Sequence, residues 1–251
     1  MTIAVAVVNI ILGLVYTSYG VMTIADMKRG WKQMGFSHFG AAWIFMAFTC
    51  GPHHLDHGLH LLIDGRAGGP LDFAAVLVGF PAGVTWFLLR VEAFNGGAGD
   101  RPIEGTPRWV SSIPLMSVAY VALLGVAMTP LLISRLAWHP TMAANAMLVV
   151  LYVVIGVVLL RTQLQNHRAR GGWSLSGLSL GIVFPTCALM HAVQSVYVAS
   201  GRYGYDAHIN AIDWLGVPAA GYFLWVVWGL YRDALSDWNR AAQRTSPVLI
   251  G

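Results

Sequence analysis

Charged side chains are scarce in this sequence. Lys and Arg number 15 and Asp and Glu 11 in 251 residues, so 10% of the chain is charged, whereas 57% is hydrophobic. About 25% of the residues of a typical soluble domain are charged, so the composition excludes an ordinary water-soluble fold. Nucleotide-binding motifs are absent as well, because the sequence contains neither a Walker motif nor a dinucleotide fingerprint.

The sequence contains long runs of apolar residues. Each run is long enough to cross about 30 Å of hydrocarbon as a helix. Backbone hydrogen bonds inside a membrane must be satisfied within the protein, which favours helices. We therefore expect an all-α membrane protein with seven transmembrane helices. The runs cover residues 3–25, 39–63, 71–91, 110–133, 143–163, 174–199 and 210–231.

The basic residues predict the orientation of these helices. Of the 15 Lys and Arg residues, 12 follow the first, third, fifth or seventh run, and only Arg66, Arg135 and Arg202 fall on the other side. Basic residues concentrate in cytoplasmic loops, so we expect the N-terminus outside and residues 236–251 as a cytoplasmic tail. Topology in the cell membrane explains the formal net charge of +4. Lipid is then the expected partner, and a nucleic-acid partner has no support.

The sequence also repeats itself. Residues 36–90 align with residues 173–227 without a gap, and a shift of one residue extends the match into the preceding span. The aligned pairs include Asn9 with Asn145, Tyr16 with Tyr152, Cys50 with Cys187 and His54 with His191. Chance identity among apolar residues does not account for rare residues in register, and a repeat of this kind determines the fold.

The repeat predicts a 3+1+3 arrangement within one membrane domain. Residues 1–95 form a first repeat of three helices, residues 105–135 a linking helix, and residues 140–235 a second repeat of three helices. The second repeat begins after an even number of spans, so the two repeats are parallel. An axis along the membrane normal then relates them.

The two cysteines suggest a metal site. Cys50 lies four residues before His54, and Cys187 four before His191, so on helices each pair shares one face. Thiolate ligands select Cu(I), and imidazole suits copper and zinc. Each repeat can hold its own ion, or the four ligands can converge on one. Ordinary core packing and a disulfide between the cysteines remain alternatives.

These residues resemble the transmembrane sensor domain of plant and cyanobacterial ethylene receptors. That domain has three helices, an outer N-terminus and a Cys-Gly-x-x-His motif that binds Cu(I) in its second helix. The motif here is Cys50-Gly51-Pro52-His53-His54. The resemblance implies Cu(I) at Cys50 and His54, and by the internal repeat at Cys187 and His191. It also implies that a small unsaturated ligand of the olefin type binds at the copper.

The first and third helices match that family only in part. The family has an acidic residue, a tyrosine seven residues later and a proline four beyond it. This sequence has Asn9, Tyr16 and Gly20 at that spacing, and the second repeat has Asn145, Tyr152 and Gly156. Val76 and Asp213 occupy the positions of a lysine in the family's third helix. By resemblance the asparagines and tyrosines are further candidate site residues without an assigned role.

Further histidines distinguish the first repeat from the second. His53, His57 and His60 follow at i, i+4 and i+7 with Asp56 beside them, and Met190 is the counterpart of His53. These side chains form a solvated helix end, a second site for a divalent ion such as zinc or iron, or a path that delivers metal. Met190 can add a thioether ligand for Cu(I).

Three classes of function stay open at this point. The resemblance favours a sensor that binds a small ligand at copper and acts through a signalling partner. The histidines favour a protein that takes up or transfers a transition metal, with a metallochaperone as partner. A membrane metalloenzyme would use His57 and Asp56 for proton transfer, but no substrate is indicated and no catalytic residue is assigned.

Overall fold

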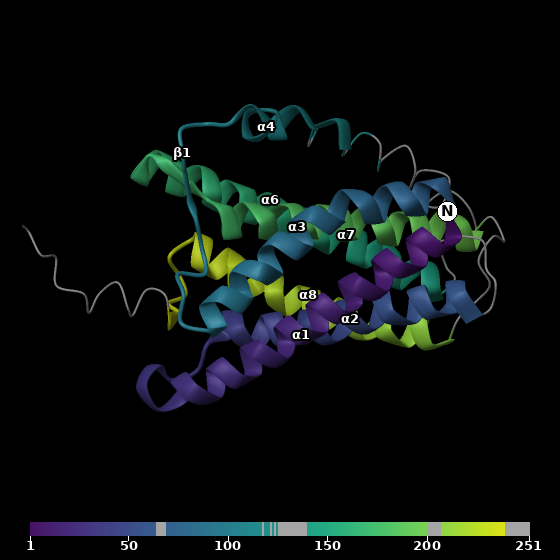
Figure 1. The fold of residues 1–251 in the computed structure, drawn as a ribbon, viewed down its shortest axis with the longest axis horizontal. Helices are drawn as coiled ribbons and strands as arrows, with labels where there is room; N and C mark the ends of the chain where they lie inside the picture. Colours follow the sequence, from purple (N-terminus) through teal and green to yellow (C-terminus); the bar gives the residue numbers. More distant parts are fainter. Residues whose placement is uncertain are drawn as a thin grey trace, which may run out of the picture.

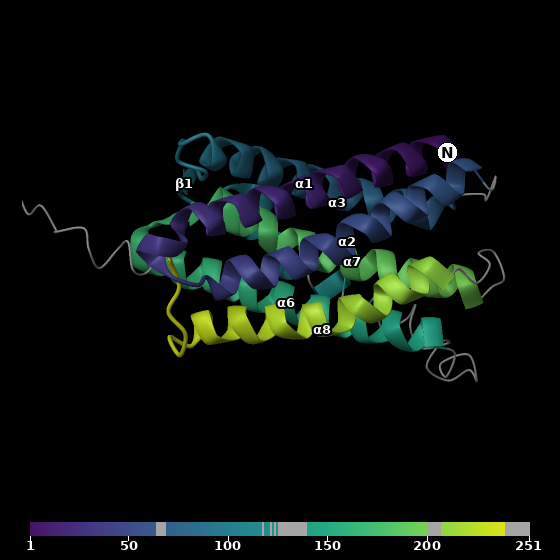
Figure 2. The ribbon, with the colours of Figure 1, turned by 90° about the horizontal axis from the view of Figure 1, so that it is seen from below.

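Six long helices form the body of the protein in a computed structural model (Figures 1 and 2). The structure describes residues 1–63, 69–116, 118–120, 122, 124, 140–199 and 207–238. The long helices are α1 (Thr2–Met34), α2 (His38–Ile63), α3 (Pro70–Phe94), α6 (Pro140–Arg170), α7 (Leu175–Ala199) and α8 (Ala207–Tyr231). The shorter elements are β1 (Pro102–Glu104), α4 (Arg108–Ser111) and β2 (Gly172–Ser174).

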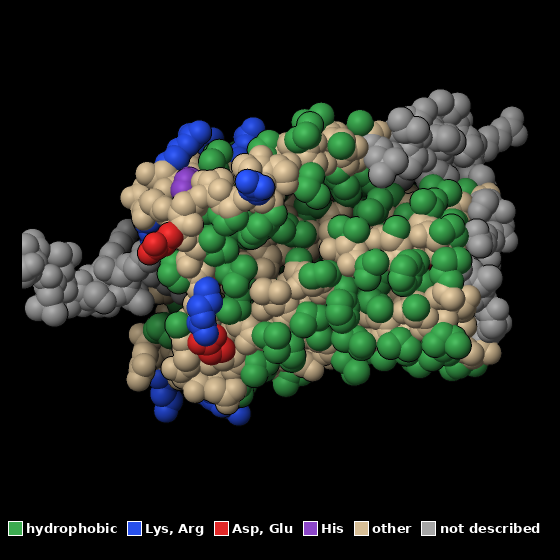
Figure 3. Space-filling view, turned by 45° about the horizontal axis from the view of Figure 1, so that its top comes forward, with side chains coloured by type: hydrophobic (Ala, Val, Ile, Leu, Met, Phe, Trp, Pro, Cys, Tyr) green, Lys and Arg blue, Asp and Glu red, His purple; other side chains and the backbone are tan. Residues whose placement is uncertain are grey.

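The composition of the helices is that of a multi-pass membrane protein. Five of them, α1, α3, α6, α7 and α8, contain stretches long and apolar enough to cross a membrane. The 26-residue helix α2 is not among these five, because its histidines and Asp56 lower its hydropathy. On the face in Figure 3, hydrophobic side chains cover most of the bundle, and Lys and Arg gather at the end near β1. The expected all-α membrane character is thus present.

The predicted linking helix can be compared with the structure over residues 105–116, 118–120, 122 and 124, and the last five of these are helical. The short helix α4 occupies Arg108–Ser111, and residues 113–116 are also helical. Residues 117, 121, 123 and 125–139 lie outside the described residues, and so do residues 239–251 of the predicted tail. The seventh predicted span and the tail therefore remain predictions.

Two helices extend beyond the apolar runs that predicted them. The first run ends at residue 25, but α1 continues through a polar stretch to Met34, and α6 likewise continues to Arg170. Each helix stops immediately before a glycine with positive φ, 71° at Gly35 and 73° at Gly171. Glycine adopts this left-handed conformation without steric cost and commonly ends helices. The hydrophobic pattern therefore marks where the membrane ends, and the glycine marks where the helix ends.

The six long helices pack in a closed ring in the order α1, α2, α8, α6, α7, α3 and back to α1. The third helix of each predicted repeat thus packs on the second helix of the other. The strands β1 and β2 pair antiparallel, with Ile103 opposite Trp173, and tie the segment after α3 to the start of α7.

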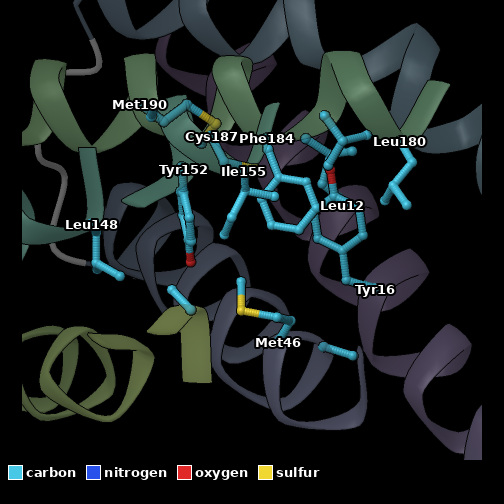
Figure 4. Packing of buried hydrophobic residues seen from close by; sticks show 14 of the residues in the cluster. Leu12, Tyr16, Met46, Leu148, Tyr152, Ile155, Leu180, Phe184, Cys187 and Met190 are labelled. Atoms are coloured by element: carbon cyan, nitrogen blue, oxygen red, sulfur yellow. The ribbon is translucent and has the colours of Figure 1, made fainter. Parts of the chain in front are cut away.

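One hydrophobic core runs through the ring. Figure 4 shows part of it, with side chains that come from four helices: Leu12 and Tyr16 from α1, Met46 from α2, Leu148, Tyr152 and Ile155 from α6, and Leu180, Phe184, Cys187 and Met190 from α7. Both tyrosines are fully buried, with 2% and 1% of their surface exposed at Tyr16 and Tyr152. A core that draws on both predicted repeats makes them one folding unit.

Close contact between α1 and α2 depends on small residues. A Cβ atom added at Gly13 of α1 would lie 2.8 Å from the carbonyl oxygen of Gly51 in α2. Glycines that allow two backbones to approach are common at helix contacts in membranes. This contact brings the first turns of α1 alongside the middle of α2, where the cysteine and histidines lie.

We expect Gly13→Val to lower the free energy of unfolding by about 1–3 kcal/mol, because the added side chain forces α1 away from α2. Unfolding by a denaturing detergent, followed by circular dichroism, measures the change. Gly221→Ala in α8 is the control, since among the described residues nothing beyond the local helix backbone lies within 4 Å of a Cβ added at that position. A loss at Gly13→Val no larger than that of the control would show that the close approach is unimportant.

Candidate metal centre

The two cysteines meet in the middle of the bundle. Cys50 of α2 and Cys187 of α7 are both free thiols, and their Sγ atoms are 3.9 Å apart. Cys187 is buried and Cys50 is half-buried among apolar side chains. The internal alignment pairs these two residues, and the fold places them side by side.

His54 completes a group of three with the cysteines. It lies one helical turn beyond Cys50, and one ligand atom from each of Cys50, His54 and Cys187 lies within 4.8 Å of those of the other two. His54 is almost entirely buried, with 2% of its surface exposed. Two sulfur atoms and one imidazole nitrogen at this separation can hold one metal ion. We call these three residues the cysteine site.

An asparagine orients the ring of His54. Asn9 of α1 donates its Nδ2 hydrogen to the carbonyl oxygen of Val5 at 2.9 Å, so its Oδ1 is the atom that accepts. The Nδ1 of His54 lies 2.8 Å from that oxygen and therefore carries the proton. The lone pair is then on Nε2. A hydrogen bond that fixes the tautomer in this way is typical of histidines that bind metals.

Asn145 orients the ring of His191 in the same way as Asn9 orients that of His54. The Nδ1 of His191 lies 2.7 Å from Oδ1 of Asn145. Asn145 in turn donates its Nδ2 hydrogen to Oδ2 of Asp213 at 2.8 Å. Both asparagines are fully buried. Asn9 and Asn145, which the internal alignment pairs, thus make equivalent contacts with His54 and His191.

His191 lies in a different group from the one its spacing predicted. Together with His53 of α2 and Asp213 of α8 it forms a second set of three residues with ligand atoms within 4.8 Å of one another. The Nδ1 of His53 lies 2.8 Å from Oδ1 of Asp213, and the Nδ1 of His191 lies 3.8 Å from the same oxygen. All three side chains are buried. We call these three residues the aspartate site.

The cysteine site and the aspartate site are neighbours in the same hydrophobic surroundings. The ring of His53 lies 4.9 Å from that of His191 and 6.1 Å from that of His54, measured between centroids. Tyr16 and Tyr152 pack against His54 and His191 respectively, each with ring centroids 5.4 Å apart. The tyrosines help to hold the two imidazoles in place.

The remaining residues of the predicted histidine stripe have separate partners. His57 is buried, and its Nε2 lies 3.7 Å from Oδ1 of Asp72 in α3. His60 is half-buried, and its Nδ1 lies 3.3 Å from Oδ2 of Asp56 on its own helix. These side chains lie outside both groups of three. Met190 is buried in the hydrophobic cluster that also contains Cys187.

Two carboxylates of this region were not predicted as site residues. Asp213 and Asp72 each lie inside an apolar helix and are 1% and 4% exposed. The signal was present in the sequence, because Asp213 is the only charged residue of α8. Ionisable groups within membrane spans are costly and usually mark functional sites. The sequence could not predict which histidines the two carboxylates face, because this depends on how the helices pack.

Comparison with known proteins identifies no relative of this chain: no family model, curated protein or solved structure matches it. The chemistry of the centre must therefore be argued from its donor atoms. The cysteine site offers soft sulfur ligands, and the aspartate site offers nitrogen and oxygen.

Proposed function

We propose that this chain is an integral-membrane copper(I) protein in which Cys50, His54 and Cys187 bind one ion. The observation that carries the proposal is the 3.9 Å separation of the two Sγ atoms with His54 in the same group. Soft thiolate ligands select Cu(I), and they also bind zinc. Two cysteines and one histidine also form zinc sites that keep one open position, so zinc is the alternative ion, and metal analysis distinguishes the two.

The three-ligand set also suits the binding of a small molecule at the ion. A metal with three protein ligands keeps a coordination position for a further ligand. The surroundings are apolar, with Tyr16, Tyr152 and Phe184 among the buried neighbours of the site. A small unsaturated molecule of the olefin type dissolves in the membrane and can reach such a position. We therefore propose a sensor that resembles the ethylene-receptor domain and acts through a signalling partner.

The proposal includes two parallel three-helix repeats, seven spans and an outer N-terminus in the cell membrane. The ring order of the helices supports it, because exchanging α1 with α6, α2 with α7 and α3 with α8 leaves that order unchanged. The matching contacts of Asn9 and Asn145 with their histidines support it too. Basic side chains lie mainly at one end of the bundle, which is what we expect of the cytoplasmic end.

The test is copper analysis of the purified protein, followed by measurement of labelled ethylene retained in detergent. We expect a single copper ion per chain, and ethylene retention that disappears when a Cu(I) chelator removes the metal. His167→Gln is the control and should keep both, because this histidine lies in the last turn of α6 and stacks on Trp173. Failure of the protein to hold copper would contradict the proposal. Copper without ethylene retention would reject the olefin ligand.

A second candidate function, copper uptake or transfer, is favoured by one feature of α2. From the half-buried end of the helix inward, His60 faces Asp56, His57 faces Asp72 and His53 faces Asp213. Such a series of imidazoles and carboxylates can pass a metal ion toward the cysteines. A metallochaperone would be the corresponding partner.

For this second candidate we expect the triple variant His57→Gln, His60→Gln, Asp56→Asn to take up copper more slowly but to reach the same final content. Slower loading follows because the outer ligands are gone, and the final content is unchanged because the cysteine site is intact. Stopped-flow competition with a coloured Cu(I) chelator measures the rate. Equal rates in wild type and variant would remove the support for uptake.

A further inference from the structure

We propose that the aspartate site, His53, His191 and Asp213, binds a second metal ion, a divalent ion of the first transition row. The centre then holds two unlike ions, one soft and one harder, in adjacent sites. Nitrogen and oxygen ligation at this second site does not require the cysteines. Its occupancy can therefore be tested separately from that of the copper proposed above.

The geometry of the three side chains suits a metal ion. They come from three helices, α2, α7 and α8, and converge from different directions on one carboxylate oxygen. Ligand atoms around an ion with bonds of about 2.1 Å lie roughly 3–4 Å apart. One ligand atom from each of the three residues lies within 4.8 Å of those of the other two. Because the Nδ1 of His191 donates to Asn145, its Nε2 is the nitrogen left for a metal ion. Asn145 holds the other carboxylate oxygen and so fixes which oxygen faces the two imidazoles.

Packing alone does not require these polar groups. In the internal alignment His53 falls opposite Met190, and Asp213 falls opposite Val76. Met190 and Val76 are both buried in the main hydrophobic cluster. The aligned positions of the two repeats thus carry buried apolar side chains in one case and a buried histidine and carboxylate in hydrogen-bond contact in the other. A buried carboxylate is costly in a membrane and is typically retained for a function.

The donor set indicates the class of metal. Two imidazoles and one carboxylate are the ligands of many iron(II) sites and also suit zinc, cobalt and manganese. They provide one negative charge for a divalent ion, which leaves the aspartate site with one positive charge.

The charges of the two sites support a pair of unlike ions. Cu(I) with two thiolates carries one negative charge, and a divalent ion with one carboxylate and two neutral imidazoles carries one positive charge. Together they are neutral. Uncompensated charge inside a membrane protein costs several kcal/mol, so each filled site stabilises the other. This charge argument rests on the proposed copper site, whereas the geometric argument does not.

Cobalt(II) is the probe for the second site, because its visible spectrum reports its ligands. We expect the copper-loaded protein to bind one Co(II) ion per chain, with d–d bands but without a sulfur-to-cobalt charge-transfer band. The double variant His53→Met, Asp213→Val should lose this Co(II) and keep its copper. It is expected to fold, because Met190 and Val76 occupy the aligned positions of the internal repeat and are both buried in the main hydrophobic cluster.

Two further variants separate this inference from the copper proposal. Cys50→Ser, Cys187→Ser should lose copper and still bind Co(II) with nitrogen and oxygen ligands. The control His38→Met removes a histidine at the start of α2 whose Nδ1 lies 3.1 Å from the hydroxyl of Tyr222, and it should bind Co(II) as wild type does. The inference would be overturned by absence of Co(II) binding, by a sulfur-to-cobalt band that disappears with the cysteines, or by unchanged Co(II) binding in His53→Met, Asp213→Val.

Discussion

Replacing either cysteine alone by serine is expected to remove nearly all of the copper. One ion shared between Cys50 and Cys187 loses a third of its protein ligands in either variant, and serine is a poor ligand for Cu(I). Loss of an outer hydrogen-bond partner already weakens metal binding by about 10–100-fold, and loss of a direct ligand should cost more. Copper per chain after gel filtration with a competing chelator measures the effect.

The single variants distinguish one shared ion from two separate ions. If each repeat held its own copper, Cys50→Ser would leave the half of the metal bound at Cys187 and His191. The account predicts instead that the two single variants and the double variant have the same low copper content. Thr49→Ser and Thr186→Ser, at the residues just before the cysteines, are the controls and should keep full copper. Half the copper in each single variant would contradict the shared site.

The second large effect concerns stability. We expect His53→Met alone to lower the free energy of unfolding by about 3–5 kcal/mol, because it leaves the buried carboxylate of Asp213 without its histidine partner. Adding Asp213→Val to that variant should restore part of the loss. The remaining cost is that of the Asn145 amide hydrogen that has lost its acceptor, about 1–3 kcal/mol.

Unfolding of the metal-free proteins by a denaturing detergent measures this coupling. The double variant should be more stable than His53→Met, although it carries one more substitution. Residues in contact commonly show such non-additive effects. A reference is Thr23→Ala, which removes a buried hydroxyl hydrogen-bonded within α1 and should add independently to either change. A double variant whose loss equals the sum of the two single losses would refute the assigned contact.

Apolar runs and helical spacing predicted much of this structure. The runs predicted the six long helices, and the spacing of Cys50 and His54 predicted that both lie on one face of α2. Both follow from local geometry, because residues four apart on a helix are neighbours whatever the rest of the fold. The internal alignment also paired Asn9 with Asn145, and each contacts its histidine.

Sequence spacing could not predict which ligands belong to the cysteine site and which to the aspartate site. Cys187 lies beside Cys50 and His54 only because α7 packs across the ring from α2. His191 belongs with His53 because Asp213, from α8, reaches both. Asp213 has no counterpart in the first repeat, so an argument from symmetry could not place it. The same holds for His57, whose partner Asp72 comes from α3.

X-ray absorption at the copper edge tests the central claim most directly. It reports the element and number of the atoms bound to copper in the intact protein. The account predicts Cu(I) with two sulfur ligands and one imidazole nitrogen in the wild type. One sulfur in place of two would contradict a site shared between α2 and α7, and a copper ion with only nitrogen and oxygen neighbours would contradict the cysteine site altogether.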